Sequence, residues 1–290
     1  MFTGAMVALI TPFHDGEIDF KTLDELVDFQ LENGIDAIAP VGTTGECPTL
    51  SHEEHKKVIE RVVRAVGGRV PVIAGAGSNS TAEAIELTSF SKNVGADATL
   101  QVGPYYNKPT QEGFYQHFKT IAEEVDLPIV LYNIPGRCGA GLTVDTIVRL
   151  AEIENIVGIK EASGSIDMAS EIAARCDLTI LSGDDSLTLP MASVGGKGVI
   201  SVVANIVPAD VKAMTDLILE GDFTSARQWH NKLFTLCRNL LGLATNPIPI
   251  KAAMAMLNMA SEEMRLPMTT LDEDKKTRLR QTLKEYGLLD

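Results

Sequence analysis

The sequence lacks the features that direct a protein to a membrane, to secretion or to nucleic acids. No apolar stretch reaches 18 residues, so we expect no transmembrane helix and no membrane partner. Residues 1–4 contain neither a basic region nor a cleavable apolar segment, which predicts a cytoplasmic protein without a secretion signal. Basic residues number 25 against 39 acidic ones, and the net charge of −14 argues against a nucleic-acid partner.

Cysteine and histidine are too few and too scattered to indicate a disulfide framework or a metal site. The four cysteines are Cys47, Cys138, Cys176 and Cys237. They form no CxxC motif and no closely spaced pair, so we expect free thiols in a reducing compartment. His52 and His55 have the i, i+3 spacing of one helix face, but no third ligand follows at a suitable distance, so we expect no metal site. The sequence also lacks the G-x-S-x-G motif of a serine-nucleophile elbow.

Apolar runs of four to six residues alternate with amphipathic stretches of helical period. Several runs are continuous and rich in β-branched residues, which suits parallel strands buried on both faces. Strands are predicted over residues 6–10, 37–41, 70–74, 98–102, 129–132, 156–160, 178–181 and 198–202. Eight strands, each followed by a helix after a short connection, indicate an α/β protein with a (β/α)8 TIM barrel. A doubly wound open sheet is the competing interpretation, although such a sheet usually has fewer strands.

Helix start signals support this alternation. The first helix is expected over residues 22–31, where leucine and valine recur at helical spacing. The candidate cap residues of later helices are Ser51, Ser80, Thr110 and either Asp184 or Asp185. The two serines are each followed three positions later by a glutamate, Glu54 or Glu83, which is the capping-box spacing.

The strand pattern stops near residue 222. Helices are predicted after it, over residues 223–241, 250–257 and 275–286. We therefore divide the chain into a catalytic barrel over residues 1–222 and a C-terminal helical extension over residues 223–290. The extension would decorate the barrel or form an oligomer contact.

In a barrel, catalytic groups lie at the carboxyl ends of the strands and in the loops that follow. The second predicted strand runs into the segment Gly42-Thr43-Thr44-Gly45-Glu46. Its glycines let the backbone approach a ligand, and its amides and hydroxyls could hold a carboxylate, although an ordinary glycine-rich turn has the same composition. The fourth strand is followed by Tyr105 and Tyr106, which could equally be packing or interface residues.

The fifth and sixth predicted strands end in residues suited to proton transfer and nucleophilic attack. Tyr132 could donate or relay a proton. Arg137, in the following Pro-Gly turn, could bind a carboxylate in bidentate fashion or form only a surface salt bridge. Lys160 ends an apolar run, where burial would lower its pKa and give the neutral amine that a Schiff-base nucleophile needs. The alternative is a lysine that extends out of the barrel mouth into water.

These strand ends resemble the signatures of a known superfamily. The matching segments are Gly42-Thr43-Thr44-Gly45-Glu46, Tyr132-Asn133-Ile134-Pro135 and Gly158-Ile159-Lys160. In this order they are similar to the motifs of the dihydrodipicolinate synthase / N-acetylneuraminate lyase superfamily. The likeness runs from Phe2 to the segment Asn246-Pro247-Ile248-Pro249, over nearly the whole chain. The double threonine, Tyr106 and Arg137 favour the synthase branch, since the sialic-acid lyase branch typically lacks that arginine.

The resemblance implies a class I aldol condensation of pyruvate with L-aspartate-4-semialdehyde, the committed step of lysine and diaminopimelate biosynthesis. It implies no metal and no organic cofactor. The implied catalytic residues are Lys160, Tyr132, Thr43 and Tyr106. Lys160 would form the Schiff base with pyruvate, and the other three would form a proton relay to which a neighbouring subunit supplies Tyr106. The implied substrate-binding residues are Thr44 and Ile200 for pyruvate, Arg137 for the carboxylate of the aldehyde, and Gly183.

The resemblance also implies feedback inhibition and an oligomer. Feedback-inhibited members bind L-lysine at a subunit interface, and the matching positions are Pro48, His52, His55, Asn79, Glu83 and Tyr105. Pro48 stands where a small residue is common. Glu83 would offer its carboxylate to the ligand's ammonium. Alternatively, Glu83 merely completes a capping box, and His52 and His55 form a solvated helix face. A homotetramer built as a dimer of dimers is expected. Two alternatives stay open, namely another pyruvate-dependent aldolase such as a sialic-acid or sugar-acid lyase, and a non-catalytic barrel that binds keto acids.

Overall fold

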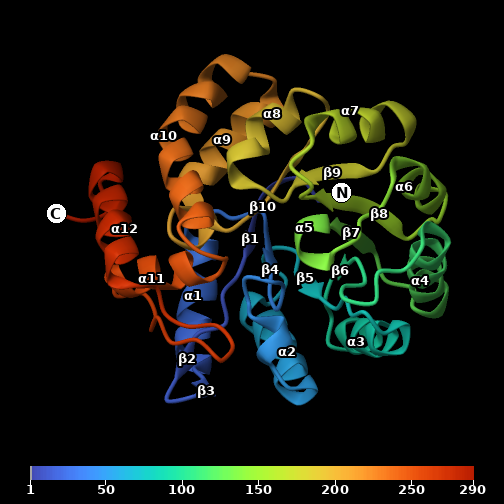
Figure 1. The fold of residues 1–290 in the computed structure, drawn as a ribbon, viewed down its shortest axis with the longest axis horizontal. Coiled ribbons are helices and arrows are strands. Elements are labelled where there is room, and N and C mark those ends of the chain that lie inside the picture. The colour runs from blue at the N-terminus through green and yellow to red at the C-terminus, as the bar shows by residue number, and fades with distance from the viewer. Residues whose placement is uncertain (1) are drawn as a thin grey trace.

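The computed structural model describes residues 2–290, and the apolar runs of the sequence form eight parallel strands in it. The strands are β1 (Gly4–Ala8), β4 (Ala37–Ala39), β5 (Ile73–Gly75), β6 (Ala98–Val102), β7 (Ile129–Asn133), β8 (Ile156–Glu161), β9 (Thr179–Ser182) and β10 (Gly198–Ser201). They pair in the order β4-β1-β10-β9-β8-β7-β6-β5. The two end strands meet through a parallel bridge between Ile38 and Val72. The sheet therefore closes into the predicted barrel, and the open-sheet alternative is wrong (Figure 1).

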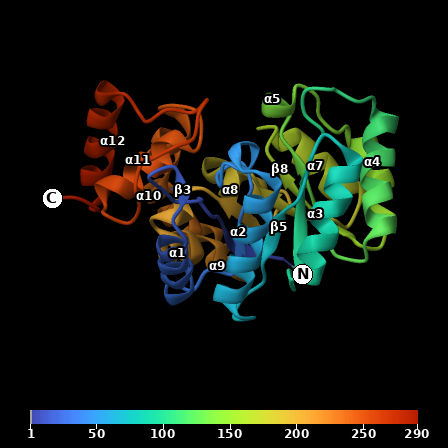
Figure 2. The ribbon, with the colours of Figure 1, turned by 90° about the horizontal axis from the view of Figure 1, so that it is seen from below.

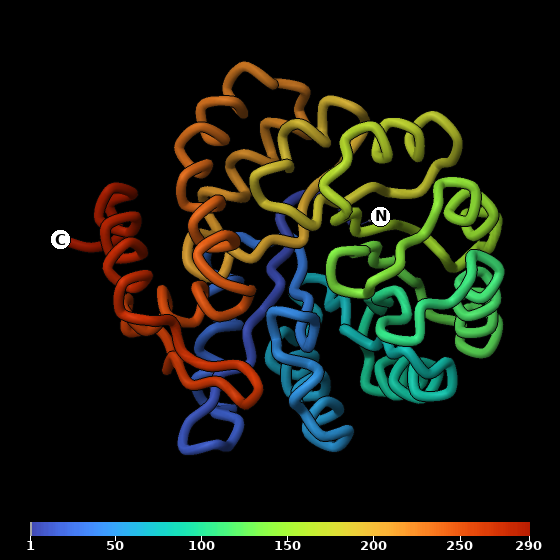
Figure 3. Tube along the Cα trace, viewed as in Figure 1, coloured from blue at the N-terminus to red at the C-terminus, as the bar shows by residue number. Residues whose placement is uncertain are grey.

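Helices connect successive strands and surround the barrel, as the Cα trace shows (Figure 3). They are α1 (Phe20–Glu32), α2 (His52–Val66), α3 (Thr81–Asn93), α4 (Gln111–Glu124), α6 (Val144–Ala151), α7 (Ile166–Arg175), α8 (Thr188–Ala192) and α9 (Pro208–Glu220). A short helix, α5 (Pro135–Cys138), lies in the loop between β7 and α6. Viewed from below, α1, α2, α3 and α4 stand along the outside of the strands (Figure 2).

The predicted cap residues Ser51, Ser80, Thr110 and Asp184 all stand at N-cap positions, but only Ser51 and Thr110 cap with their side chains. Ser51 forms a complete capping box with Glu54, and the Thr110 side chain accepts a hydrogen bond from the Gly113 amide. Ser80 is the N-cap residue of α3 but makes no side-chain cap, and the predicted capping box is absent, since Glu83 accepts a 2.7 Å hydrogen bond from the Ser78 hydroxyl. Asp184 is the N-cap residue of the short 3-10 helix Asp185–Leu187 but makes no side-chain cap, and the Asp185 carboxylate binds Ser201 and the Val202 amide.

The strand boundaries differ from the prediction where local chemistry intervenes. β5 begins at Ile73 rather than residue 70, because Pro71 has no amide hydrogen to donate to a neighbouring strand. A two-stranded hairpin, β2 (Phe13–His14) and β3 (Glu17–Ile18), was not predicted. Its turn is Asp15-Gly16, with φ of +50° and +83°, which is the Asp-Gly signal of a tight hairpin.

The predicted C-terminal helices are present as α10 (Phe223–Gly242), α11 (Ile248–Met256) and α12 (Glu273–Tyr286). They lie at one side of the barrel beside α9 and α1 (Figure 1). Leu233 and Leu279 of these helices share a continuous apolar core with Val211 of α9. The division of the chain into a barrel and an extension at residue 222 remains a prediction. Within residues 2–290, none of the helices is long and apolar enough to cross a membrane.

Strand alternation decides which side chains enter the barrel. Along β7, Ile129 and Leu131 pack outward against the helices, whereas Val130 and Tyr132 join the interior cluster. The interior residues of this cluster include Met6, Ala37, Ile73, Leu100, Val130, Tyr132, Leu181 and Ile200. On β8, Gly158 pairs with Val130 and Lys160 pairs with Tyr132. The two-residue period of a strand therefore places Lys160 in the interior, one residue before β8 ends.

Candidate active site

Lys160 is enclosed at the carboxyl end of β8. Lys160 is only 5% exposed, so the alternative of a lysine extended into water is wrong. The pKa of Lys160 is lowered to about 8, chiefly by burial and to a smaller extent by Arg137, while the carboxylates of Asp185 and Asp184 act in the opposite direction. About a tenth of the amine is consequently neutral at pH 7, far more than for an ordinary lysine, and a nucleophile requires this form.

Tyr132 lies beside Lys160 on the neighbouring strand. The Lys160 Nζ is 4.4 Å from the centroid of the Tyr132 ring. Burial raises the pKa of Tyr132 to about 12, and a hydrogen bond with the Thr43 side chain offsets part of this effect. The phenol therefore keeps its proton at neutral pH and can deliver it to a reacting oxygen or carbon.

The loop after β4 carries both threonines and has a strained backbone. Val41 and Glu46, at its two ends, each have a φ of +54°, a region that side chains other than glycine rarely adopt. The loop is fixed by a 3.1 Å hydrogen bond from the Gly45 amide to the Gly42 carbonyl. Thr44 is buried, at 3% exposure. Strain of this kind persists where the surrounding structure holds it, and such sites are often functional.

The strands β9 and β10 complete the interior wall. Ile200 is fully buried there, in the same cluster as Tyr132. Gly183 donates a 2.8 Å hydrogen bond to the Glu161 carbonyl, and a Cβ at this position would come within 2.5 Å of the Ala162 Cβ. Only glycine therefore fits beside the end of β8 without displacing it.

Asp185 is a site residue that the motifs did not reveal. It is 4% exposed and binds both the Ser201 hydroxyl and the Val202 amide at the end of β10. Burial raises its pKa, while these hydrogen bonds and Lys160 lower it. Its charge and that of Lys160 therefore depend on one another. The sequence had suggested Asp185 only as one of two candidate helix caps.

Arg137 lies at the mouth of the barrel, on α5. Its Nη2 donates a 2.8 Å hydrogen bond to the main-chain carbonyl of Asn246, in the segment between α10 and α11. The Asn246 Nδ2 in turn donates a 3.0 Å hydrogen bond to the Thr44 hydroxyl. These residues line a cavity of about 230 Å³, the mouth cavity, whose walls are Thr43, Glu46, Pro48, Thr49, Arg137, Asn246, Pro247, Pro267 and Met268. Asn246 was noted in the sequence only as part of a motif, and the structure places it inside the site.

Tyr106 lies in an exposed loop outside the buried group of its own chain. It follows β6 in a loop where its φ is +72°, and it is 89% exposed. The structure therefore brings Lys160, Tyr132 and Thr43 together but leaves Tyr106 outside this group.

The residues matched to a lysine site divide into a connected group and an outlying residue. Glu83 accepts from the Ser78 hydroxyl at 2.7 Å, and Ser78 also bonds with the Tyr105 side chain. The Asn79 Nδ2 donates to the Tyr105 carbonyl at 3.1 Å. Pro48 instead lines the mouth cavity.

The two histidines of this set differ from one another. His52 is exposed, but His55 is 7% exposed and its Nε2 lies 2.7 Å from the Gly75 carbonyl oxygen. Burial lowers the pKa of His55, so the ring is mainly neutral at neutral pH. The expectation of a solvated helix face is wrong for His55, because this face of α2 packs onto the end of β5.

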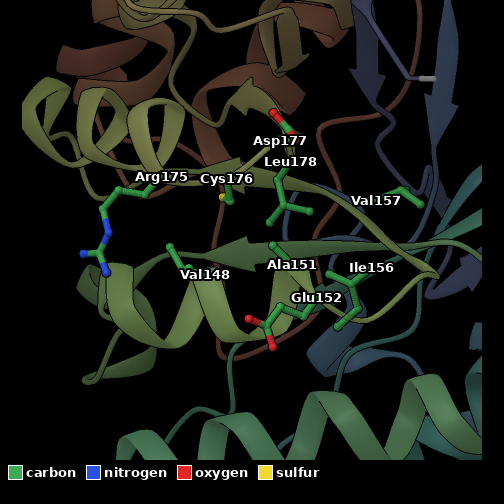
Figure 4. Close-up of a pocket in the computed structure, with 9 residues that line it drawn as sticks. All are labelled: Val148, Ala151, Glu152, Ile156, Val157, Arg175, Cys176, Asp177 and Leu178. Atoms are coloured by element: carbon green, nitrogen blue, oxygen red, sulfur yellow. The ribbon is translucent and has the colours of Figure 1, made fainter.

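A separate hollow lies at the opposite end of the barrel (Figure 4). It is lined by residues of α6 and of the segments that lead into β8 and β9, including Glu152, Ile156 and Asp177. Ile156 begins β8 and Lys160 lies four residues further, roughly 13 Å along a strand. This hollow is therefore remote from the buried lysine, at the end of a barrel where catalytic groups are not found. No cluster of three or more histidine, cysteine, aspartate or glutamate side chains suited to a metal ion occurs within residues 2–290.

A closed parallel barrel that buries a lysine of lowered pKa beside a tyrosine has the geometry of lysine-dependent barrel enzymes. A family model described as the dihydrodipicolinate synthetase family matches residues 1–286, and the chain belongs to this family. The 4-hydroxy-tetrahydrodipicolinate synthase of Syntrophobacter fumaroxidans is 54% identical over 292 residues, covering 100% of both chains. That of Aquifex aeolicus is 53% identical and covers 99% of both. The predicted superfamily and its synthase branch are confirmed.

Solved structures agree in fold and sequence. The crystal structure of dihydrodipicolinate synthase from Aquifex aeolicus matches with a TM-score of 0.97 and 52% identity, over 99% of both chains. The Acinetobacter baumannii enzyme, solved with pyruvate, matches with a TM-score of 0.97 and 45% identity over 100% of both chains. The Cyanidioschyzon merolae enzyme, solved with lysine bound, has a TM-score of 0.95 and 42% identity over 99% of both.

Proposed function

We propose that this protein is a lyase that condenses pyruvate with L-aspartate-4-semialdehyde to give 4-hydroxy-tetrahydrodipicolinate, in the route to lysine and diaminopimelate. The observation that carries the proposal is the Lys160 amine, buried beside Tyr132 with its pKa lowered to about 8, in a chain about half identical to synthases over its full length. Such an amine attacks the keto carbon of pyruvate, and loss of water leaves a protonated imine.

The protonated imine withdraws electrons from the pyruvate methyl group. Loss of a methyl proton gives an enamine, whose carbon forms a bond to the aldehyde carbon of the second substrate, while the aldehyde oxygen takes up a proton. The amine of the second substrate, once deprotonated, attacks the imine carbon and closes the ring. The bond to Lys160 then breaks and returns a neutral amine to the enzyme.

Each of these steps moves a proton, and Tyr132 is placed to do so. Its raised pKa makes it a donor in its resting state, and its bond with Thr43 gives the proton a path toward the barrel mouth. Tyr106 completes the path from a neighbouring subunit. Its 89% exposure supports this assignment, since a large aromatic side chain held outward gains most by burial against a partner.

The substrates are held by residues of the mouth and the interior wall. Thr44 and the Ile200 backbone contact pyruvate, and Gly183 allows its segment to pack tightly against the end of β8. Arg137 binds the carboxylate of the aldehyde substrate through its planar guanidinium. Its bond to the Asn246 carbonyl, 2.8 Å long, supports this role because it fixes one edge of the guanidinium and leaves the other free.

L-Lysine is the proposed inhibitor, bound by His52, His55, Asn79, Glu83 and Tyr105, with Pro48 at the margin. The link through Ser78 between Glu83 and Tyr105 supports a shared site, and the lysine-bound Cyanidioschyzon merolae relative offers a parallel. The enzyme would assemble as a homotetramer, a dimer of dimers. Its four free cysteines suit the reducing environment of the cytoplasm, where we place it.

The test is to mix purified protein with pyruvate and L-aspartate-4-semialdehyde and to follow pyruvate, with a control that lacks the aldehyde. Consumption that requires the aldehyde supports the synthase. A protein that traps pyruvate with borohydride but consumes none would instead act on other aldehydes, or in the lyase direction on sugar acids. A folded protein that neither consumes nor traps pyruvate would be a binding barrel.

A further inference from the structure

Asn246 connects the two halves of the proposed site. It lies between α10 and α11, yet its Nδ2 donates to the Thr44 hydroxyl at 3.0 Å and its main-chain carbonyl accepts from Arg137 at 2.8 Å. Under the proposed function, Thr44 faces pyruvate and Arg137 faces the carboxylate of the aldehyde substrate. Asn246 also lines the mouth cavity in which that second substrate would sit.

The other end of the Asn246 amide has no partner. Its Oδ1 is buried and accepts no hydrogen bond from any group within residues 2–290. Leaving a buried acceptor unpaired costs roughly 1–3 kcal/mol, so buried oxygens of this kind usually have a partner in the working state of a protein. Three other side-chain atoms share this condition, on Gln30, Gln101 and His117, and none of those residues lines the mouth cavity.

Whether the Thr44 hydroxyl donates or accepts determines which atom of the Asn246 side-chain amide has no partner. When this hydroxyl donates to the pyruvate carboxylate, its oxygen is left to accept, and only the Asn246 Nδ2 can donate to it. Oδ1 then remains available to a donor on the second substrate. The carboxylate of Glu46, another wall residue, is already paired with Lys251 and with the Arg265 amide.

We infer that the Asn246 Oδ1 accepts a hydrogen bond from the α-ammonium of the second substrate and so selects an α-amino aldehyde acid over its deamino analogue. This inference rests on the proposed function. The α-carboxylate and the α-ammonium of L-aspartate-4-semialdehyde share one carbon, so a carboxylate held by Arg137 brings the ammonium close to Asn246.

A neutral acceptor also suits the ring closure. The ammonium must lose a proton before its nitrogen can attack the imine carbon. A carboxylate partner would stabilise the charged form and resist that loss, whereas an amide oxygen orients the group without adding a negative charge. Asn246 thus selects and positions the second substrate, and its lack of charge lets the substrate ammonium lose its proton.

The experiment compares two aldehydes in wild-type protein and in Asn246→Ala. L-Aspartate-4-semialdehyde carries the ammonium, and succinic semialdehyde carries the same carboxylate and aldehyde without it. We expect Asn246→Ala to raise KM for the first by about 10-fold or more, the range for a lost hydrogen bond to a charged group. The inhibition constant of succinic semialdehyde should stay within about threefold, which lies below that range. Thr245→Ala, at an exposed neighbouring side chain, is the matched control and should behave as wild type.

A second variant separates the acceptor from the Thr44 contact. Asn246→Asp keeps an acceptor of the same shape but, like Asn246→Ala, cannot donate to Thr44. It should retain a near-normal KM for L-aspartate-4-semialdehyde, with the pH profile of kcat displaced upward. Equal weakening of both aldehydes in Asn246→Ala, or an Asn246→Asp variant as impaired in KM as Asn246→Ala, would overturn the inference. Wild-type protein that consumes no pyruvate with the aldehyde would instead refute the proposed function itself.

Discussion

Lys251 of α11 forms a buried ion pair with Glu46, with its Nζ 2.5 Å from the Glu46 Oε1 and both side chains at most 2% exposed. Glu46 closes the strained loop that carries Thr43 and Thr44, and its φ is +54°. The pair is flanked by the Phe13 ring, which lies 4.3 Å from the Lys251 Nζ. The C-terminal extension therefore anchors the threonine loop through charge, at the point where that loop meets the barrel mouth.

Removing one partner of this pair should destabilise the protein strongly. Lys251→Met leaves the Glu46 charge buried without its cation, and we expect a loss of about 3–5 kcal/mol in the free energy of unfolding. The double variant Glu46→Gln/Lys251→Met should recover part of it, because no charge remains buried. Denaturant unfolding at equal protein concentrations measures both. Lys275→Met, which breaks an exposed pair with Asp272, is the control and should change stability by less than about 1 kcal/mol.

Lys160→Ala should abolish the adduct that borohydride traps with pyruvate. Among residues 2–290, Lys160 alone combines burial at a strand end with a pKa lowered to about 8. Mass spectrometry of the reduced protein detects the adduct, and Lys197→Ala, at an exposed lysine that precedes β10, should still form it. An adduct that persists in Lys160→Ala would show that a different lysine is the nucleophile.

Adduct formation should rise with pH and level off above about 8, because protonation blocks the amine below its pKa. At pH 6 only about 1% of a group with that pKa is neutral. Asp184 stabilises the protonated form, so Asp184→Asn should move the midpoint to lower pH. The midpoint is obtained from the rate of cyanoborohydride trapping measured across a range of pH. Asp177→Asn makes the same charge change at the far end of the barrel and should leave the midpoint in place.

The barrel and the strand ends that form the candidate site could be predicted because both depend on local patterns. Continuous apolar runs revealed the strands, and the rule that strand ends carry the chemistry identified Lys160 and Tyr132 without any contact information. Strand alternation then places both in the interior, one opposite the other. Boundaries moved by up to three residues, and at β5 the shift follows from Pro71.

Asn246 and Lys251 could not be found in this way. Asn246 meets Thr44 across 202 residues and Lys251 meets Glu46 across 205, and no periodicity spans such distances. The interpretation of His55 as part of an exposed helix face was wrong for a related reason. Its helix spacing beside His52 suggested one exposed face, but only the closed barrel shows that Gly75 covers it.

Tyr106→Phe should lower turnover, by up to about 100-fold, while pyruvate adduct formation stays near normal. The phenol hydroxyl would be lost from the relay, whereas Lys160 and Tyr132 are untouched. Steady-state rates and trapping measure the two effects. Tyr115→Phe is the control, since that ring stacks on Arg149 outside the barrel. Unchanged turnover would remove Tyr106 from the relay.

A mixing experiment tests whether Tyr106 crosses between subunits. Lys160→Ala and Tyr106→Phe proteins are each expected to be impaired alone. In a mixed dimer, the Tyr106→Phe subunit keeps its lysine and would receive an intact Tyr106 from its Lys160→Ala partner. Co-refolded mixtures should therefore regain activity. No recovery, in mixtures shown to contain hybrid oligomers, would mean that Tyr106 does not serve a neighbouring site.

Glu83→Gln should make the enzyme resistant to L-lysine. Its carboxylate is held by the Ser78 hydroxyl at 2.7 Å, in a group that includes Tyr105, and it supplies the negative charge that a ligand ammonium would need. A neutral amide keeps the shape but loses the charge, so the lysine concentration for half inhibition should rise by about 10-fold or more. Inhibition is measured against each variant's own uninhibited rate. Glu86→Gln, one turn along α3 and paired with Lys56, is the matched control and should keep wild-type sensitivity. A wild-type enzyme fully active in millimolar lysine would rule out the proposed site.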